Sequence, residues 1–311
     1  MTHVGVVGAG VMGAGVAQNL AQCGHTVALV DRDPDAIKQA LSGIETQCRM
    51  SRLLGGPEID AEAVIGRIST DTDLLLLAEA EVVIENITEN WELKRALYRE
   101  MDPVVRPDAV FVANTSAIPI TRLASLTKRP RQFVGVHFMN PVPMKPAVEL
   151  IPGHHTSQAA LERVRDLLSS MGKKAIDVND ACGFVSNRVL MLTVNEAAYL
   201  VHENVATAET VDEVFRSCFG HPMGPLETAD LIGVDTILYS VEVLYEHYAD
   251  SKYRPCPLLK HMTDAGLHGR KTGEGFYSYG PSATATGRSA TATATGRSAA
   301  GGGTDRSPSH D

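Results

Sequence analysis

The chain has 311 residues, which is long for one compact domain and favours two. Hydrophobic residues make up 44% of it and charged residues 21%, a composition typical of globular proteins. The formal net charge of -9 argues against nucleic acid as a partner, because phosphate binding needs a basic surface.

The sequence predicts no contact with a membrane, since no stretch reaches the roughly 20 apolar residues that a membrane span needs. The N-terminus enters a predicted strand directly, without the basic flank and apolar segment of a secretory signal. The five cysteines have no Cys-x-x-Cys spacing, and we expect free thiols in a reducing cytoplasm. No metal site is expected.

The first elements of the chain predict a β-α-β unit. Residues 2–7 form an apolar run typical of a buried parallel strand, and a glycine-rich turn follows at 8–13. Residues 12–23 have helical spacing, and residues 26–30 form a second apolar strand that ends at Asp31. Such units almost always have a right-handed crossover.

Strands continue to alternate with helices up to about Cys182. Helices are predicted at 35–54 and 91–101, and strands at 81–84, 110–113, 133–136, 148–151 and 175–178. This alternation predicts an α/β fold with a Rossmann-type, doubly wound and mostly parallel sheet in residues 1–182. We expect Glu85 only to end a strand.

The remainder of the chain has a different pattern. Residues 183–280 predict an all-helical C-terminal domain, with helices at 187–204, 210–219, 226–231 and 236–248. Residues 281–311 contain an internal repeat, Thr-Ala-Thr-Gly-Arg-Ser-Ala, and no Val, Ile, Leu or aromatic residue. Such a segment cannot bury enough apolar surface to offset its ordering entropy, so a disordered low-complexity tail is expected.

The glycine-rich turn predicts a dinucleotide site. Its sequence, Gly8-Ala9-Gly10-Val11-Met12-Gly13, matches G-x-G-x-x-G between a strand and a helix, where backbone N–H groups face a pyrophosphate. Asp31, at the end of the next strand, is placed to accept hydrogen bonds from a ribose 2′-hydroxyl and to repel a 2′-phosphate. NAD is therefore the expected cofactor, although the adjacent Arg32 leaves NADP open.

A nicotinamide enzyme that oxidises an alcohol needs a base for the hydroxyl proton, and histidine suits this task near neutral pH. Of the eleven histidines, His137 follows the predicted strand at 133–136 and so lies near the edge where open α/β sheets bind ligands. Glu149 follows closely and is a candidate to hold the second ring nitrogen. Position alone leaves a structural role for His137 open.

Several segments resemble the L-3-hydroxyacyl-CoA dehydrogenase family, in matching order from Val4 to about Tyr279. The matching runs are GVHFMNPVPMKPAVELI at 135–151, VIENITE at 83–89, NTS at 114–116, GFVSNR at 183–188, PMGP at 222–225 and GEGFY at 273–277. The resemblance implies reversible, NAD-dependent oxidation of the 3-hydroxyl of an acyl thioester, as in fatty acid metabolism. It also implies a homodimer formed through the helical domain.

The family's residue roles are carried over to the matching positions. The resemblance makes His137 the general base and Glu149 its orienting partner. The other implied roles are substrate binding by Ser116 and Asn187, support of the site by Asn140, and cofactor contacts by Glu89, Lys94 and Asn114.

The sequence does not fix which group carries the acyl chain as a thioester. Residues 35–57 contain only three basic residues, Lys38, Arg49 and Arg52, where family members that act on coenzyme A often carry several lysines. This favours, weakly, a hydroxyacyl group on an acyl carrier protein, as in polyketide extender-unit synthesis. The sequence also leaves open a dehydrogenase of a free hydroxy acid or sugar acid, and an idle NAD-binding structural protein. Acyl chain length and physiological direction are not fixed by the sequence.

Overall fold

The computed structural model describes residues 1–51, 53 and 58–280; the predicted tail at 281–311 lies outside the described residues. Strand β1 (His3–Val7), helix α1 (Val11–Gln22) and strand β2 (Thr26–Val30) form the predicted β-α-β unit, with β1 and β2 parallel. Gly8 links β1 to the turn with φ of 97°, a left-handed conformation that favours glycine. A Cβ on Gly13 would lie 1.7 Å from the Gly8 carbonyl oxygen, so only glycine lets α1 approach the turn this closely.

The sheet has eight strands in the order β3-β2-β1-β4-β5-β6-β7-β8. The further strands are β3 (Ile68–Asp71), β4 (Val82–Glu85), β5 (Val110–Ala113), β6 (Phe133–His137), β7 (Ala147–Pro152) and β8 (Lys174–Asp177). All neighbouring pairs are parallel except β6 and β7, which are antiparallel. This arrangement confirms the predicted fold class.

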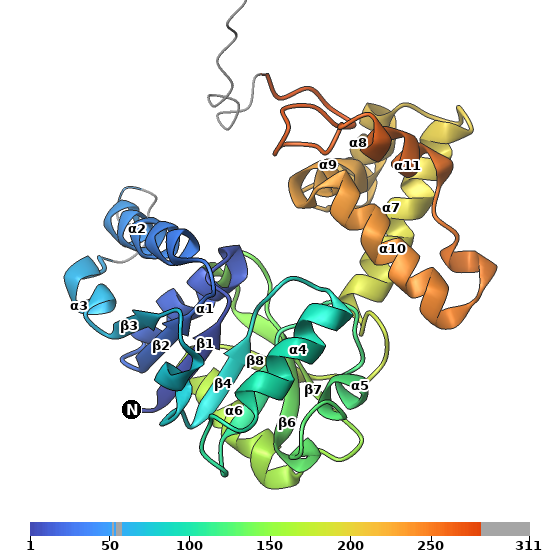
Figure 1. Cartoon of the computed structure of the whole chain (residues 1–311). Helices are drawn as coiled ribbons and strands as arrows, with labels where there is room; N and C mark the ends of the chain where they lie inside the picture. The colour runs from blue at the N-terminus through green and yellow to red at the C-terminus, as the bar shows by residue number, and fades with distance from the viewer. Residues whose placement is uncertain (52, 54–57, 281–311) are drawn as a thin grey trace, which may run out of the picture.

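Helices cover both faces of the sheet (Figure 1). One face packs against α1, α2 (Pro34–Met50), α3 (Ala61–Ile65) and α6 (Gln158–Ser170), and the other against α4 (Trp91–Met101) and α5 (Ile120–Ala124). Helix α2 buries Ile37, Ala40, Ile44 and Cys48, which recur at helical spacing along one stripe. It begins where the Asp33 carboxylate accepts a hydrogen bond from the Asp35 amide. It ends at Met50, short of the predicted end at residue 54.

The helical part of the chain consists of α7 (Ser186–His202), α8 (Ala208–Phe219), α9 (Pro225–Ile232), α10 (Val234–Tyr248) and α11 (Pro257–Asp264). These helices form a group of their own beside the sheet, drawn in yellow to orange (Figure 1), around one apolar core. That core also includes Ala117 and Cys182, so it continues onto loops next to the sheet. No helix within the described residues is long and apolar enough to cross a membrane.

Short 3-10 turns complete the structure, at Leu74–Leu77, Pro130–Gln132, Val142–Met144 and Ser251–Tyr253. Five helices and strands were not predicted: α3, α5, α6, α11 and β3. Strand β3 is a half-exposed edge strand with the polar sequence ISTD, and α11 has eight residues of which only Leu259 and Met262 are buried. Both are too short, and carry too few apolar side chains, for a clear periodic signal.

Candidate active site

His137 and Glu149 face each other across two strands. His137 is the last residue of β6, one residue inside the strand that we expected it to follow, and it pairs in register with Glu149 of the antiparallel β7. Its Nδ1 lies 2.8 Å from Glu149 Oε2, and both side chains are buried. An ionised carboxylate only accepts hydrogen bonds, so Nδ1 carries the proton and Nε2 presents its lone pair.

Glu149 receives hydrogen bonds on both oxygens. Its Oε1 accepts from the backbone N–H groups of Val185 and Ser186, each at 3.0 Å, and its Oε2 also accepts from the Ser186 hydroxyl at 2.6 Å. Burial acts to raise the pKa of Glu149, but the hydrogen bonds from His137 and Ser186 lower it from 4.5 to about 2. The carboxylate therefore stays ionised at neutral pH, beside an imidazole that can become charged.

Ser116 lies on the other side of the imidazole. Its Oγ is 3.1 Å from His137 Nε2, the nitrogen left free to accept. Asn187, in the first turn of α7, donates from Nδ2 to the Ser116 carbonyl oxygen at 3.1 Å. The loop after β5, the end of β6, strand β7 and the start of α7 thus bring together the four residues predicted for catalysis: His137, Glu149, Ser116 and Asn187.

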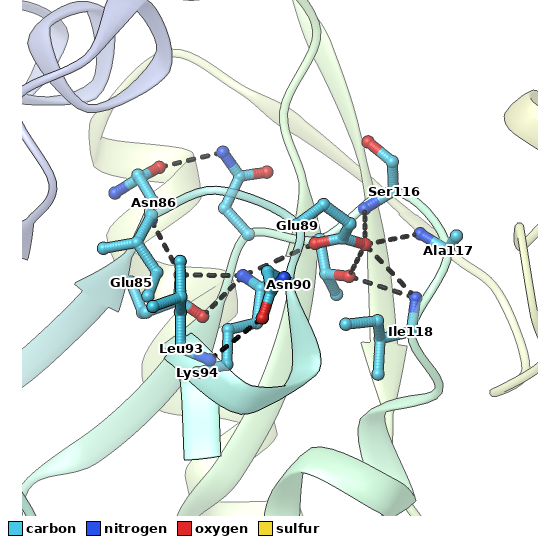
Figure 2. Close-up of polar contacts among 12 residues, drawn as sticks. Glu85, Asn86, Glu89, Asn90, Leu93, Lys94, Ser116, Ala117 and Ile118 are labelled. Atoms are coloured by element: carbon cyan, nitrogen blue, oxygen red, sulfur yellow. Dashed lines mark hydrogen bonds and ion pairs between the residues drawn. The ribbon is translucent and has the colours of Figure 1, made fainter. Parts of the chain in front are cut away.

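Glu89 holds the loop that carries Ser116, as Figure 2 shows. Its Oε1 accepts from the Thr115 hydroxyl and from three consecutive backbone N–H groups, those of Ser116 at 3.1 Å, Ala117 at 3.0 Å and Ile118 at 3.3 Å. The Tyr239 hydroxyl of α10 donates to the Glu89 carbonyl oxygen at 2.6 Å. Glu89 therefore connects the Ser116 loop with the helical part.

A buried ion pair lies beneath this loop (Figure 2). Lys94 Nζ donates to both oxygens of Glu85, at 2.7 and 2.8 Å, and lies 3.5 Å from Glu89 Oε2. The side chains of Glu85 and Lys94 have no exposed surface. Burial acts to lower the pKa of Lys94, but the two carboxylates raise it. Glu85 thus does more than end a strand: it also accepts from the Tyr98 hydroxyl at 3.1 Å.

Because Lys94 is fully buried, it could touch a cofactor directly only if this segment moved, so its predicted cofactor contact stays a prediction. Asn114 donates to the Asn86 side chain at 2.8 Å and accepts from the Phe138 backbone N–H at 3.2 Å, which places it between β4 and β6. Asn140, predicted to support the site, is exposed beyond the end of β6.

A cavity of about 540 Å³ lies where the first parallel strands end, and it fits part of a dinucleotide. Its lining includes Gly8, Gly10 and Asp31 of the predicted cofactor residues, together with Asn86 and Glu100. The N-cap of α1 is Gly10, which supplies no side-chain cap, so the first N–H groups of the helix remain available to phosphate. The remaining predicted cofactor residues do not line this cavity: Val11, Met12, Gly13, Glu89, Lys94 and Asn114.

Asp31 has a second task that the motif did not reveal. Its Oδ2 accepts from the Ala9 backbone N–H at 2.7 Å and its Oδ1 from the Asp33 N–H at 2.9 Å. The Asp31 carboxylate therefore holds the glycine turn against the end of β2 by a hydrogen bond. Each oxygen keeps a further lone pair, so the geometry remains compatible with a ribose hydroxyl.

The sequence did not predict the contacts of three residues of the site. Ser186 contacts both His137 and Glu149, Tyr239 contacts the Glu89 loop, and Glu85 anchors Lys94. Ser186 had one usable signal, its position next to Asn187. The other two contacts join residues that only the fold brings together.

The chain matches two family models in succession. Residues 3–181 match "3-hydroxyacyl-CoA dehydrogenase, NAD binding domain", and residues 183–279 match "3-hydroxyacyl-CoA dehydrogenase, C-terminal domain".

Curated relatives and solved structures agree with these models. A probable 3-hydroxybutyryl-CoA dehydrogenase of Deinococcus radiodurans is 44% identical over 275 residues, which cover 88% of this chain and 99% of the relative. One of Bacillus subtilis is 45% identical, over 88% of this chain and 96% of the relative. The crystal structure of the (S)-3-hydroxybutyryl-CoA dehydrogenase PaaH1 of Ralstonia eutropha is similar with a TM-score of 0.84 and 40% identity, covering 90% of this chain and 99% of that chain.

Proposed function

The chain belongs to the 3-hydroxyacyl-CoA dehydrogenase family, and we propose that His137 is the base that removes the proton of a substrate's 3-hydroxyl group. The chain is an NAD-dependent oxidoreductase that converts a 3-hydroxyacyl thioester to its 3-oxo form. The observation that carries the assignment of the base is the hydrogen-bonded series Glu149–His137–Ser116.

The geometry leaves one ring nitrogen for chemistry. His137 Nδ1 is engaged by Glu149, so the Nε2 lone pair takes the hydroxyl proton. The charge that forms on the ring is stabilised by the ionised Glu149 carboxylate, 2.8 Å from Nδ1. NAD, held at the glycine turn and Asp31, would supply the acceptor for the hydride from C3. In the reverse direction the imidazolium returns the proton from Nε2 to the carbonyl oxygen.

Ser116 and Asn187 position the reacting oxygen. The Ser116 hydroxyl is 3.1 Å from Nε2, so a substrate hydroxyl that bonds to Nε2 also lies within reach of Ser116 Oγ. Asn187 donates to the carbonyl of the same serine and comes from the helical part, so the seating of α7 and the placement of Ser116 depend on each other. Asn140, Glu89 and Asn114 keep their proposed supporting and cofactor roles.

We propose coenzyme A first as the carrier of the acyl thioester, because the relatives that match nearly the whole chain are described as 3-hydroxybutyryl-CoA dehydrogenases. A carrier-protein thioester is the second candidate. One observation favours it: two cations of α2, Lys38 and Arg49, already pair with Asp35 and Glu45 of the same helix. These exposed ion pairs hold the two cations only weakly, so the carrier-protein thioester stays second to coenzyme A.

We also propose that two copies of the chain associate through the helical part. Large apolar side chains are exposed on α8, α9 and α10, among them Val214, Phe219, Leu231 and Tyr245. Association of two copies through these helices would remove such apolar side chains from water, which would favour an interface there. The molar mass in solution, measured by light scattering, tests this.

The five cysteines are all free, which supports a cytoplasmic location.

NADH absorbance at 340 nm tests the function directly. Acetoacetyl-CoA, an acetoacetyl carrier-protein thioester and free acetoacetate are compared at equal concentration. We expect rapid turnover of a thioester and little of the free acid. Equal rates on free acetoacetate would contradict thioester specificity and favour a hydroxy-acid dehydrogenase. NADH binding without turnover of any of the three would instead indicate an idle NAD-binding protein.

A further inference from the structure

We propose that Ser186 is a positioning residue for the catalytic base, one that fixes Glu149 and through it the imidazole of His137. This inference rests on the proposed function of His137 as base. Ser186 is the first residue of α7, in the helical part of the chain, and it lies on the Nδ1 side of the ring, away from the nitrogen that faces substrate.

The Ser186 side chain contacts both members of the pair. Its Oγ is 2.6 Å from Glu149 Oε2 and 3.2 Å from His137 Nδ1. A hydroxyl has one proton, and the shorter contact with an acceptor-only carboxylate takes it. The serine oxygen then turns a lone pair toward the Nδ1–H group, whose proton is shared between Glu149 and Ser186. The imidazole plane is thus held by two acceptors.

The backbone of the same residue holds the other carboxylate oxygen. The N–H groups of Ser186 and Val185 both donate to Glu149 Oε1 at 3.0 Å. Val185, the N-cap of α7, makes no side-chain cap, and the first turn of α7 contains no acidic residue. Glu149 therefore caps α7 from outside the helix, where the positive end of the helix dipole favours a negative charge.

These contacts fix the carboxylate in two directions at once. Ser186 bonds to Oε1 through its backbone and to Oε2 through its side chain, so the carboxylate can rotate only by breaking one of these bonds. Replacing the side chain removes the Oε2 bond and leaves the backbone cap intact. The substitution consequently tests orientation of the base without detaching α7 from the sheet.

The kinetic test compares Ser186→Ala with Ser186→Thr, which keeps a hydroxyl. We expect Ser186→Ala to lower kcat about tenfold in both directions, with KM for the acyl thioester and Kd for NADH changed less than about twofold. Ser186→Thr should recover most of this loss. Ser240→Ala is a matched control, because Ser240 is a buried serine of α10 that donates only to its own helix, and its kinetics should match the parent.

A double-variant cycle separates positioning from a general structural effect. If Ser186 acts through Glu149, Ser186→Ala should lower kcat less than about twofold in a Glu149→Gln background. Full additivity of the two losses, or an unchanged kcat in Ser186→Ala, would overturn the proposal. Retained turnover in His137→Ala would contradict the proposed function itself, whatever Ser186 does, so the two failures are distinguishable.

Discussion

Replacing Lys94 by methionine should destabilise the protein by about 3 kcal/mol at pH 7, because it leaves the Glu85 carboxylate buried without its counter-ion. Removing one partner of a buried pair typically costs about 3–5 kcal/mol. The lower end applies here, since Glu85 keeps hydrogen bonds from the Tyr98 hydroxyl at 3.1 Å and the Ile87 N–H at 2.8 Å. The free energy of unfolding, measured by urea titration followed by circular dichroism, gives the difference.

The pH dependence of this loss has a definite sign. Burial raises the pKa of Glu85 against the opposing charge of Lys94, and without Lys94 it rises further. A carboxyl group whose folded pKa exceeds its unfolded value destabilises the fold fully above the folded pKa, and this destabilisation is lost as the pH falls from the folded pKa towards the unfolded pKa. The loss in Lys94→Met should therefore shrink as the pH falls from 7 to about 5.

The control removes both charges together. Glu85→Gln combined with Lys94→Met leaves no buried charge, and it should be more stable at pH 7 than Lys94→Met alone. A loss below about 1 kcal/mol in Lys94→Met, or a loss that is the same at pH 7 and pH 5, would show that Glu85 is not left as a buried unpaired charge.

Three further predictions concern the site. Glu149→Gln should lower kcat by about 10²–10⁴-fold in the NADH assay, with Kd for NADH unchanged. Because the folded pKa of Glu149 is about 2, the stability that its carboxylate contributes should be lost as the pH falls from about 4.5 to 2. Acid titrations of both proteins should show this loss in the parent and not in Glu149→Gln. Asp31→Asn should weaken NAD binding at least about tenfold in calorimetry and should lower the ratio of the affinity for NAD to that for NADP. Unchanged affinities for the two cofactors would contradict a contact between Asp31 and the ribose. Tyr239→Phe removes only the hydrogen bond to the Glu89 carbonyl oxygen. It should lower kcat/KM for the thioester about fivefold and leave Kd for NADH unchanged. A weaker affinity for NADH would contradict this prediction.

Local sequence predicted the parts of the site that depend on neighbouring residues. Glycines at 8, 10 and 13 between a strand and a helix indicate a dinucleotide turn, and the cavity lies at that turn. Two of them meet a local backbone requirement, the positive φ of Gly8 and the close approach of Gly13 to the Gly8 carbonyl. A carboxylate twelve residues after His137 suggested a partner, and the antiparallel pairing of β6 with β7 places it opposite the ring. The family match then extended these patterns to most of the chain.

Two of the contacts that the sequence did not predict join segments far apart along the chain. The Ser186 hydroxyl reaches Glu149 across 37 residues, and Tyr239 reaches Glu89 across 150. No periodicity records such pairs, because each depends on how α7 and α10 pack beside the sheet. Glu85 and Lys94 are nine residues apart, but only their complete burial shows that they form a pair rather than two exposed charges.

The role of His137 as base is tested most directly by the turnover of His137→Ala, measured at 340 nm with acetoacetyl-CoA and NADH. The affinity of the same variant for NADH is measured by fluorescence. Loss of the base should lower kcat by about 10²–10⁴-fold, while Kd for NADH stays within about twofold of the parent because His137 does not line the cofactor cavity. A folded His137→Ala variant that binds NADH normally and keeps more than about a tenth of the parent's kcat would contradict the assignment of His137 as the base.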